Sequence, residues 1–397
     1  MLFRSIDAKS SHTGGHCARV PELALMLARE AERESSGPLA PFRFASEAEW
    51  REFRIGAWLH DCGKVTTPDF VVDKATKLET LHNRIHEIRT RFEVLLRDAR
   101  IARLEGELAG GDPEALERTY RERQAELEEQ FAFVAACNVG QEAMDREHID
   151  RLRQIGSQGW RRHFDDSLGL SWQELELLRP GPAVPGVDDT AGMVGTATPA
   201  AGIESGVPER LLADQPWHRI PRRASDIPDA SHGFRMAVPE LLYNHGELHN
   251  LSIISGTLNS EERYKINEHI VQTILMLEAL PLPSDLARVP EYAGTHHETV
   301  SGSGYPRGLK GDELSIPARI MAIADIFEAL TAPDRPYKKA KSLSQSVAIL
   351  AGFRDRGHID ADLFDLFLRR GVHRAYAERF LRPEQIDSVD ESQYLRA

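Results

Sequence analysis

Cysteine is scarce in this sequence: only Cys17, Cys62 and Cys137 occur among 397 residues. A small and odd number of cysteines argues against a disulfide framework and fits a reducing compartment. The sequence also lacks any run of about 18 consecutive apolar residues, the length that a membrane span requires. Its opening residues, MLFRSIDAKS, lack the apolar run of a secretory signal. We therefore expect a cytoplasmic protein with no membrane span in this chain.

Basic charge is scarce as well, because 49 lysines and arginines stand against 62 aspartates and glutamates, which gives a net charge of -13. A surface that binds nucleic-acid polymers needs a basic field, so this composition argues against such a partner. An anionic substrate would have to be held by local cations and metal ions. With 41% hydrophobic residues, the chain can bury one large core or two smaller ones.

Histidine and aspartate in apolar surroundings are what the sequence does offer. The adjacent His296 and His297 precede a glycine-dense loop that ends in Gly304-Tyr305-Pro306, and an apolar helical run, 320–330, follows with Asp325 in its middle. Imidazole nitrogen and carboxylate oxygen suit a borderline-hard divalent ion, and a buried aspartate needs a cationic partner. This stretch therefore predicts part of a metal site whose other ligands lie elsewhere in the chain.

The other ligands are predicted upstream, where His60 and Asp61 stand in the run IGAWLHDCGK. This run resembles the signature of the HD phosphohydrolase superfamily. With HHE at 296–298 and GYP at 304–306, the closer resemblance is to the HD-GYP family, the cyclic di-GMP phosphodiesterases of bacterial second-messenger signalling. Further segments resemble that family in the same order: GGHCARVPELA, LNSEERYKINEH, DIFEAL and DRPYK. The resemblance covers about half of the chain, residues 6–80 and 245–345.

The resemblance implies a set of seven metal ligands: His16, His60, Asp61, His269, His296, His297 and Asp325. Seven nitrogen and oxygen ligands without a thiolate suit two octahedral or near-octahedral ions, iron or manganese, better than structural zinc. Some relatives in this family carry an acidic ligand for a third metal four residues before the first histidine. Here that position is His12, and whether it binds a metal stays open.

The resemblance further implies hydrolysis of cyclic di-GMP to pGpG, and onward to GMP as an open alternative, by in-line attack of a metal-bridged hydroxide. Asp61 would bridge the metals, and Lys64 would stabilise charge that develops on the phosphorus. Tyr305, Arg335 and Lys338 would contact the substrate, since a guanidinium offers a planar fork matched to phosphate oxygens.

Two positions depart from the family pattern. Ser301 replaces the aspartate of the common form DGSGYP, which affects partner docking or loop stability more than hydrolysis. Pro333 adds one residue between Asp325 and DRPYK, so the register of that motif is shifted. The resemblance also leaves room for a protein partner at the GYP loop and for a homodimer.

Two alternatives to this function stay open. The chain could be an HD phosphohydrolase that acts on another cyclic dinucleotide or on a nucleotide, and a substrate panel separates the two. It could instead be a non-catalytic module that binds cyclic di-GMP or docks a partner. Loss of metal ligands would have favoured that module, yet every expected position is filled.

We expect an all-α fold, an HD-domain helical bundle with an inserted helical subdomain, in which the HD helix spans 48–61. The family helix that normally follows soon after residue 80 has its match only at 258–269. We therefore predict core segments at 1–80 and 241–397, around an insertion at 81–240. Within it, Leu-rich stretches at 84–108 and 114–133, separated by GGDP, predict an antiparallel helical hairpin. Further helices are expected near 142–155 and 171–178, and the Pro- and Gly-rich segment 179–206 predicts a mobile loop.

Overall fold

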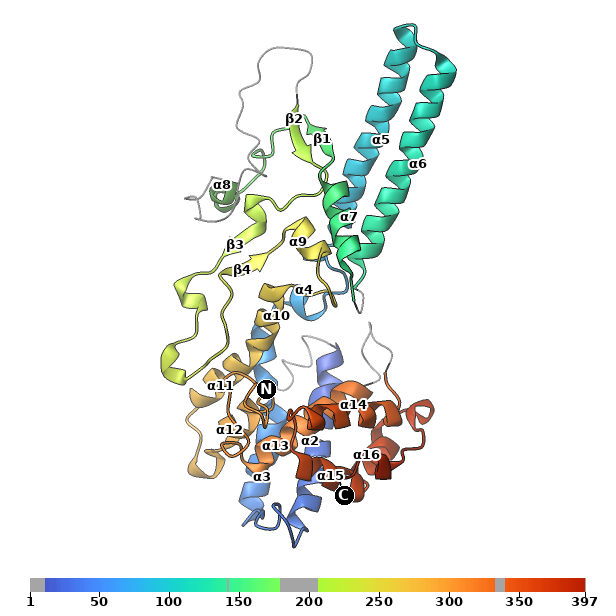
Figure 1. The fold of residues 1–397 in the computed structure, drawn as a ribbon. Helices are drawn as coiled ribbons and strands as arrows, with labels where there is room; N and C mark the ends of the chain where they lie inside the picture. The colour runs from blue at the N-terminus through green and yellow to red at the C-terminus, as the bar shows by residue number, and fades with distance from the viewer. Residues whose placement is uncertain (1–10, 141–142, 179–205, 333–339, 397) are drawn as a thin grey trace. The chain divides into compact units, whose positions relative to one another are not determined.

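The computed structural model describes residues 11–140, 143–178, 206–332 and 340–396. The structure is mostly helical, which confirms the expected all-α fold (Figure 1). Within the described residues, no helix combines the length and the apolar character that a bilayer span needs. The predicted loop at 179–206 lies outside these residues except for its last position.

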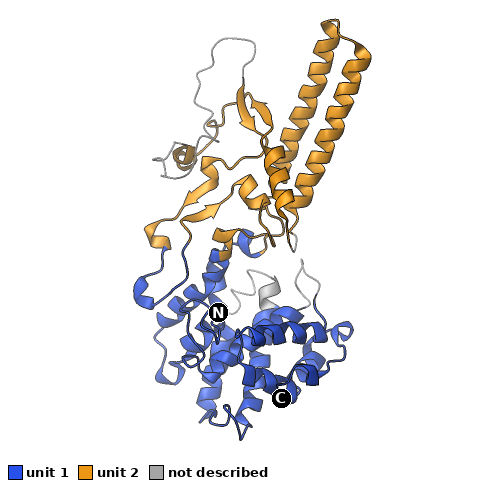
Figure 2. Cartoon of the chain, in the orientation of Figure 1, with its two compact units in different colours: residues 1–72, 227–238, 264–397 blue, residues 73–226, 239–263 orange. Residues whose placement is uncertain are grey.

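Contacts between residues divide the chain into two units (Figure 2). The first, which we call the core unit, comprises Met1–Val72, Ile227–Val238 and Tyr264–Ala397. The second, the inserted unit, comprises Asp73–Asp226 and Pro239–Arg263. The short stretch Ile227–Val238 thus belongs to the core unit although the chain on both sides of it belongs to the inserted unit.

The core unit is built from helices that pack around one large apolar cluster. Helix α13 packs on α2, α12 and α14, and α3 packs on both α2 and α12. Leu23, Phe327 and Phe367 are among the fully buried side chains of this cluster. The helices are α2 (Ser11–Glu32), α3 (Glu47–Leu59), α4 (Asp69–Val72), α11 (His269–Glu278), α12 (Val289–Gly294), α13 (Ile316–Thr331), α14 (Leu343–Asp355), α15 (Ala361–Arg369) and α16 (Val372–Phe380).

Helix α13 confirms the helical run predicted at 320–330 and begins four residues earlier. The side chain of Ser315 accepts a hydrogen bond from the amide of Ala318 at 3.4 Å, and Pro317 stands in the first turn, so both residues favour a helix start here. Ile320 and Phe327 lie on its buried side. Because this helix packs on α2, it brings its polar residues to the helix that carries His16.

The segment around His60 differs from the prediction. Helix α3 ends at Leu59, and a 3-10 turn, η1 (Cys62–Thr66), follows, so the predicted helix 48–61 is two residues too long. A Cβ atom on Gly63 would lie 2.0 Å from the carbonyl oxygen of His269 and 2.5 Å from the amide nitrogen of Thr273. Only glycine permits this approach to α11. The chain therefore turns at Asp61 and places that carboxylate beside His269.

The inserted unit contains the predicted helical hairpin. Helices α5 (Ile85–Leu108) and α6 (Pro113–Asn138) pack against each other as two long neighbours (Figure 1), which confirms the prediction. Gly110 takes a positive φ of 83° at the turn, and Asp112 accepts a hydrogen bond from the amide of Glu114 at 3.1 Å. Helices α7 (Arg146–Gly156) and α8 (Trp172–Leu178) match the two further helices that we expected.

Two small antiparallel sheets in the inserted unit were not predicted. Strand β1 (Gly159–Arg162) pairs with β2 (Val207–Arg210), and β3 (Arg219–Pro221) pairs with β4 (Leu241–Asn244). These strands have three or four residues each, too few for an alternating apolar pattern to stand out in the sequence. The remaining helices are α9 (Glu247–Leu251) and α10 (Ser260–Asn267), whose last residues belong to the core unit.

Candidate metal centre

The core unit brings together the side chains of all seven residues proposed as metal ligands. They come from five segments: α2, the turn between α3 and η1, the first residue of α11, the turn after α12, and the middle of α13. These positions are occupied by His16, by His60 and Asp61, by His269, by His296 and His297, and by Asp325. Residues far apart in the sequence therefore form one compact group of nitrogen and oxygen atoms.

The group contains three sets of three residues that could each hold an ion; the set His60, Asp61 and His296 overlaps the other two, which share no residue. His16, His60 and Asp325 form one set, and the ligand atoms lie within 4.8 Å of one another. In this set, His16 Nε2 lies 3.0 Å from Asp325 Oδ1 and 3.3 Å from His60 Nε2. The set that shares no residue with it consists of three histidines, His269, His296 and His297.

Asp61 lies between these two sets. Its Oδ2 atom is 3.3 Å from His16 Nε2 and 3.4 Å from His60 Nε2, whereas its Oδ1 atom is 3.3 Å from His269 Nε2. The side chain is almost completely buried. The two oxygens of one carboxylate thus face different sets of histidines, as a bridging ligand between two ions would require.

The tautomers of three histidines suit metal binding. The Nδ1 atoms of His60, His269 and His296 each lie within hydrogen-bond distance of the backbone carbonyl three residues earlier, at 2.7, 2.5 and 2.9 Å. A carbonyl oxygen can only accept, so we assign the proton to Nδ1, which leaves the lone pair of Nε2 directed into the group. The Nε2 atom of His296 is buried and has no hydrogen-bond partner. A metal ion would satisfy this atom.

The surroundings of His296 and Asp61 keep these two side chains in the charge states that divalent ions bind. Burial, together with the neighbouring His60, lowers the pKa of His296 to about 3, so this imidazole is neutral at physiological pH. Burial alone would raise the pKa of Asp61, but Lys64 and His60 outweigh that effect and hold it well below its usual value. A neutral imidazole beside an ionised carboxylate fits a site for a divalent metal ion.

A buried carboxylate that the sequence analysis did not single out contacts the first of these ligands. Glu328, fully buried in α13, pairs with Nδ1 of His16 and accepts a hydrogen bond from Arg19 Nε at 2.7 Å. Such partners fix the orientation of a metal-binding imidazole. The sequence carried a usable signal, since Glu328 follows Asp325 by three positions and therefore lies on the same side of the helix.

Tyr305 lies at the edge of the ligand group. Its ring stacks on that of His297, with centroids 4.8 Å apart and an interplanar angle of 15°. Its hydroxyl donates to Asn267 Oδ1 at 3.3 Å. Of the other residues proposed to contact substrate, Arg335 and Lys338 lie outside the described residues, as does the side chain of His12.

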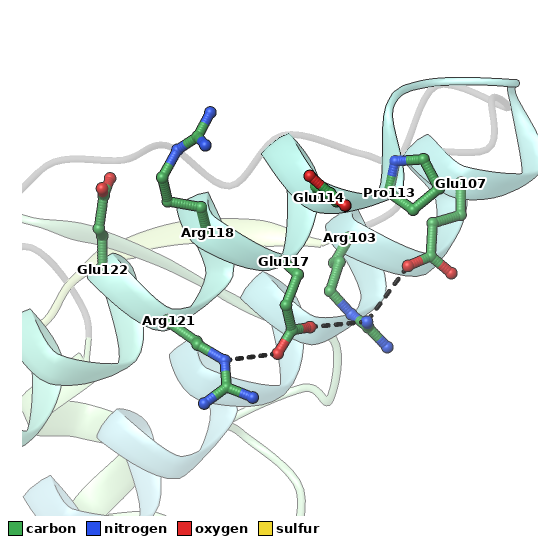
Figure 3. A pocket seen from close by; sticks show the side chains of 8 residues that line it. All are labelled: Arg103, Glu107, Pro113, Glu114, Glu117, Arg118, Arg121 and Glu122. Carbon is green, nitrogen blue, oxygen red and sulfur yellow. Dashed lines mark hydrogen bonds and ion pairs between the residues drawn. The ribbon is translucent and has the colours of Figure 1, made fainter.

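A hollow on the inserted unit offers a different environment (Figure 3). It lies near the turn between α5 and α6, where Arg103 pairs with Glu117 at 2.8 Å and Arg121 pairs with the same glutamate at 2.7 Å. These charged groups neutralise one another. None of the sets of three metal-ligating side chains found among the described residues includes a residue of this hollow.

Comparison with known proteins agrees with this geometry. The sequence matches the HD domain family over residues 13–135 and again over 207–363. A 3'3'-cGAMP-specific phosphodiesterase of Vibrio cholerae is 38% identical over 132 residues, which is 32% of this chain and 30% of that protein. A cyclic di-GMP phosphodiesterase of Pseudomonas aeruginosa is 31% identical over 34% of this chain and 29% of its own length.

A cyclic di-GMP phosphodiesterase of Thermotoga maritima is 41% identical over 23% of this chain and 24% of that protein. In each case the match spans less than a third of the relative's length. The two family matches and the grouped histidine and aspartate side chains lead to the same conclusion: this chain carries an HD domain.

Proposed function

We propose that the chain is a metal-dependent phosphodiesterase that hydrolyses a cyclic dinucleotide, with cyclic di-GMP as the first candidate. The observation that supports this most is the position of Asp61 between two sets of three potential ligands. Two divalent ions held there, iron or manganese, would supply Lewis-acid activation of water and would neutralise phosphodiester oxygens.

Lys64 would stabilise the transition state. Burial alone would lower the pKa of this lysine, but Asp61 raises it above its usual value, so the ammonium group stays charged. Its Nζ lies 2.6 Å from Asp61 Oδ2, and 31% of its side chain is exposed. A fixed cation beside the bridging carboxylate can stabilise negative charge that develops on phosphate oxygens.

Tyr305 would provide a flat wall for a nucleobase or sugar at the edge of the site, and Arg335 and Lys338 remain proposed contacts for the substrate phosphates. The sequence relatives support the substrate class, since they carry names for hydrolysis of cyclic di-GMP and of 3'3'-cGAMP. The second candidate is therefore 3'3'-cGAMP, supported by the Vibrio relative that is 38% identical. The proposed products of cyclic di-GMP are pGpG and GMP.

Turnover by protein purified without oxygen and supplied with iron or manganese tests this proposal. Cyclic di-GMP, 3'3'-cGAMP and the linear dinucleotide pGpG are offered separately, and the products are separated by chromatography. We expect hydrolysis of at least one cyclic dinucleotide and loss of that activity in Asp61→Asn. Glu384→Gln, an exposed substitution in the same unit, serves as the control.

Metal-bound protein that leaves every cyclic dinucleotide intact would contradict the proposal. Binding of cyclic di-GMP without turnover in such a sample would favour the alternative of a non-catalytic binding module. Hydrolysis of mononucleotides alone would favour another HD phosphohydrolase activity.

A further inference from the structure

The connection between strands β3 and β4 is unusually long. The two strands pair as an antiparallel ribbon in the inserted unit, yet residues 222–240 separate them, whereas hairpin loops usually have two to five residues. The middle of this connection, Ile227–Val238, belongs to the core unit. We call this stretch the strap.

The two ends of the connection are fastened to each other. Arg222 Nε donates to the carbonyl oxygen of Pro239 at 3.0 Å, and its Nη2 donates to that of Leu241 at 3.3 Å. Its Nη1 also donates to the carbonyl oxygen of Asp226 at 3.3 Å. One guanidinium thus joins the two ends of the connection on either side of the strap.

The strap contacts the residues that directly follow Tyr305. The amide of Arg235 donates to the carbonyl oxygen of Pro306 at 2.7 Å. Arg307 Nε donates to the carbonyl oxygen of His232 at 3.2 Å, and its guanidinium carbon lies 5.4 Å from the centre of the Phe234 ring. Pro306 and Arg307, two successive residues of the loop that contains Tyr305, are therefore bound to the strap by backbone and side-chain contacts.

Arg307 and His232 also contact α11, the helix that begins with His269. Arg307 Nη2 donates to Glu278 Oε1 at 3.2 Å, and His232 Nδ1 lies 3.4 Å from Glu278 Oε2. Glu278 is the last residue of α11, and His269 is the first. The strap is therefore anchored at the end of a helix whose other end supplies a proposed metal ligand.

The loop is held from its other side by the metal centre. The Tyr305 ring stacks on His297, and the amide of Tyr305 donates to the carbonyl oxygen of His297 at 3.1 Å. The buried carboxylate of Glu298 accepts hydrogen bonds from the amides of Arg307 and Leu309, at 2.7 and 2.9 Å. Residues 305–307 thus have the proposed ligand His297 on one side and the strap on the other.

From this arrangement we infer that the strap is a positioning element that sets the placement of Tyr305 beside the metal centre. It does so through its contacts with Pro306 and Arg307. Loss of these contacts changes the affinity for substrate more than the chemical step, a consequence that rests on the proposed function. Phe234 and Arg307 are the positioning residues.

Hydrogen exchange of the full-length protein, followed by mass spectrometry, tests the inference without any need for turnover. Phe234→Ala alters the strap side of the contact, and Arg307→Ala alters the loop side, so either variant carries the test if the other fails to fold. Ser231→Ala is the matched control, because Ser231 lies exposed in the same strap. Thermal unfolding and metal content are measured on every variant.

We expect exchange in peptides covering 298–309 to become about two- to fivefold faster in both variants, the range that a partly exposed cation–π contact supports. The control and the metal content should stay unchanged. Where a cyclic dinucleotide is hydrolysed, KM should rise by a similar factor with a smaller change in kcat. Unchanged exchange in both variants would overturn the inference. A lack of turnover in the parent protein would count against the proposed function, while the exchange result would still decide the role of the strap.

Discussion

Asp325 and Glu328 stand three positions apart on α13 and reach opposite nitrogens of the same imidazole: Asp325 Oδ1 lies 3.0 Å from His16 Nε2, whereas Glu328 pairs with His16 Nδ1. The helix thus supplies one proposed ligand and also the carboxylate that orients another. Arg19, which donates to Glu328 at 2.7 Å, balances the charge of this fully buried group.

Glu328→Gln should therefore weaken metal binding by about 10- to 100-fold, the usual cost of losing a partner that orients a metal-binding histidine. Competition with a chelator of known affinity measures the change. Glu328→Asp keeps the charge and should recover part of the affinity, while the exposed Glu384→Gln serves as the control. Equal affinity in Glu328→Gln and the parent protein would show that Glu328 does not orient His16.

Lys64→Met should reduce kcat by about 100- to 1000-fold, comparable to the loss of one donor that stabilises charge in a transition state. The metal content should remain, because Lys64 supplies no ligand atom to the group. Elemental analysis and turnover on the same sample make the comparison. Loss of metal together with activity would instead mean that the lysine acts by holding Asp61 in place.

Tyr305 offers a matched pair of substitutions. Tyr305→Phe keeps the ring that stacks on His297 and loses only the hydroxyl bond to Asn267, so KM should change by about twofold. Tyr305→Ala removes the ring, and KM should rise about fivefold or more if a base stacks there. Steady-state kinetics with the hydrolysed dinucleotide distinguishes the two. An alanine variant with the parent KM would exclude Tyr305 from substrate binding.

The inserted unit should lose stability as the pH falls from 6.5 to 4. Burial and the nearby Arg84 lower the pKa of His218 to about 4, and burial lowers that of His245 to about 4 as well. The unfolded chain takes up these protons near pH 6.5, while the folded unit does not until about pH 4. The free energy of unfolding should therefore fall by about 1–3 kcal/mol across this window.

The titration of His249 has the opposite effect on stability, but at a pH above 6.5. The carboxylate of Glu261, 3.6 Å from His249 Nε2, raises the pKa of His249, so its contribution to stability is complete below pH 6.5 and is lost as the pH rises through the raised value. Urea unfolding followed by tryptophan fluorescence at a series of pH values measures how the free energy of unfolding changes with pH. Replacing His218 with glutamine should make this change smaller between pH 6.5 and 4. An unchanged pH dependence would show that His218 does not contribute to it.

The sequence was most informative where function depends on side-chain identity. The seven proposed ligands stand in short motifs, and the structure brings their side chains into one group. The end of α3 was less predictable, because it depends on how closely Gly63 approaches α11, some 200 positions later. The strap could not be predicted from the sequence. Its contact between the amide of Arg235 and the carbonyl oxygen of Pro306 joins two backbone groups, which leave no signature in residue type.

The central claim is a centre for two metal ions joined by Asp61. Elemental analysis of protein purified without oxygen, compared with Asp61→Ala prepared in the same way, tests it most directly. We predict about two equivalents of iron or manganese per chain in the parent protein and a marked loss in the variant. Metal-free parent protein that stays metal-free after incubation with both ions, or a variant that keeps two equivalents, would contradict the account.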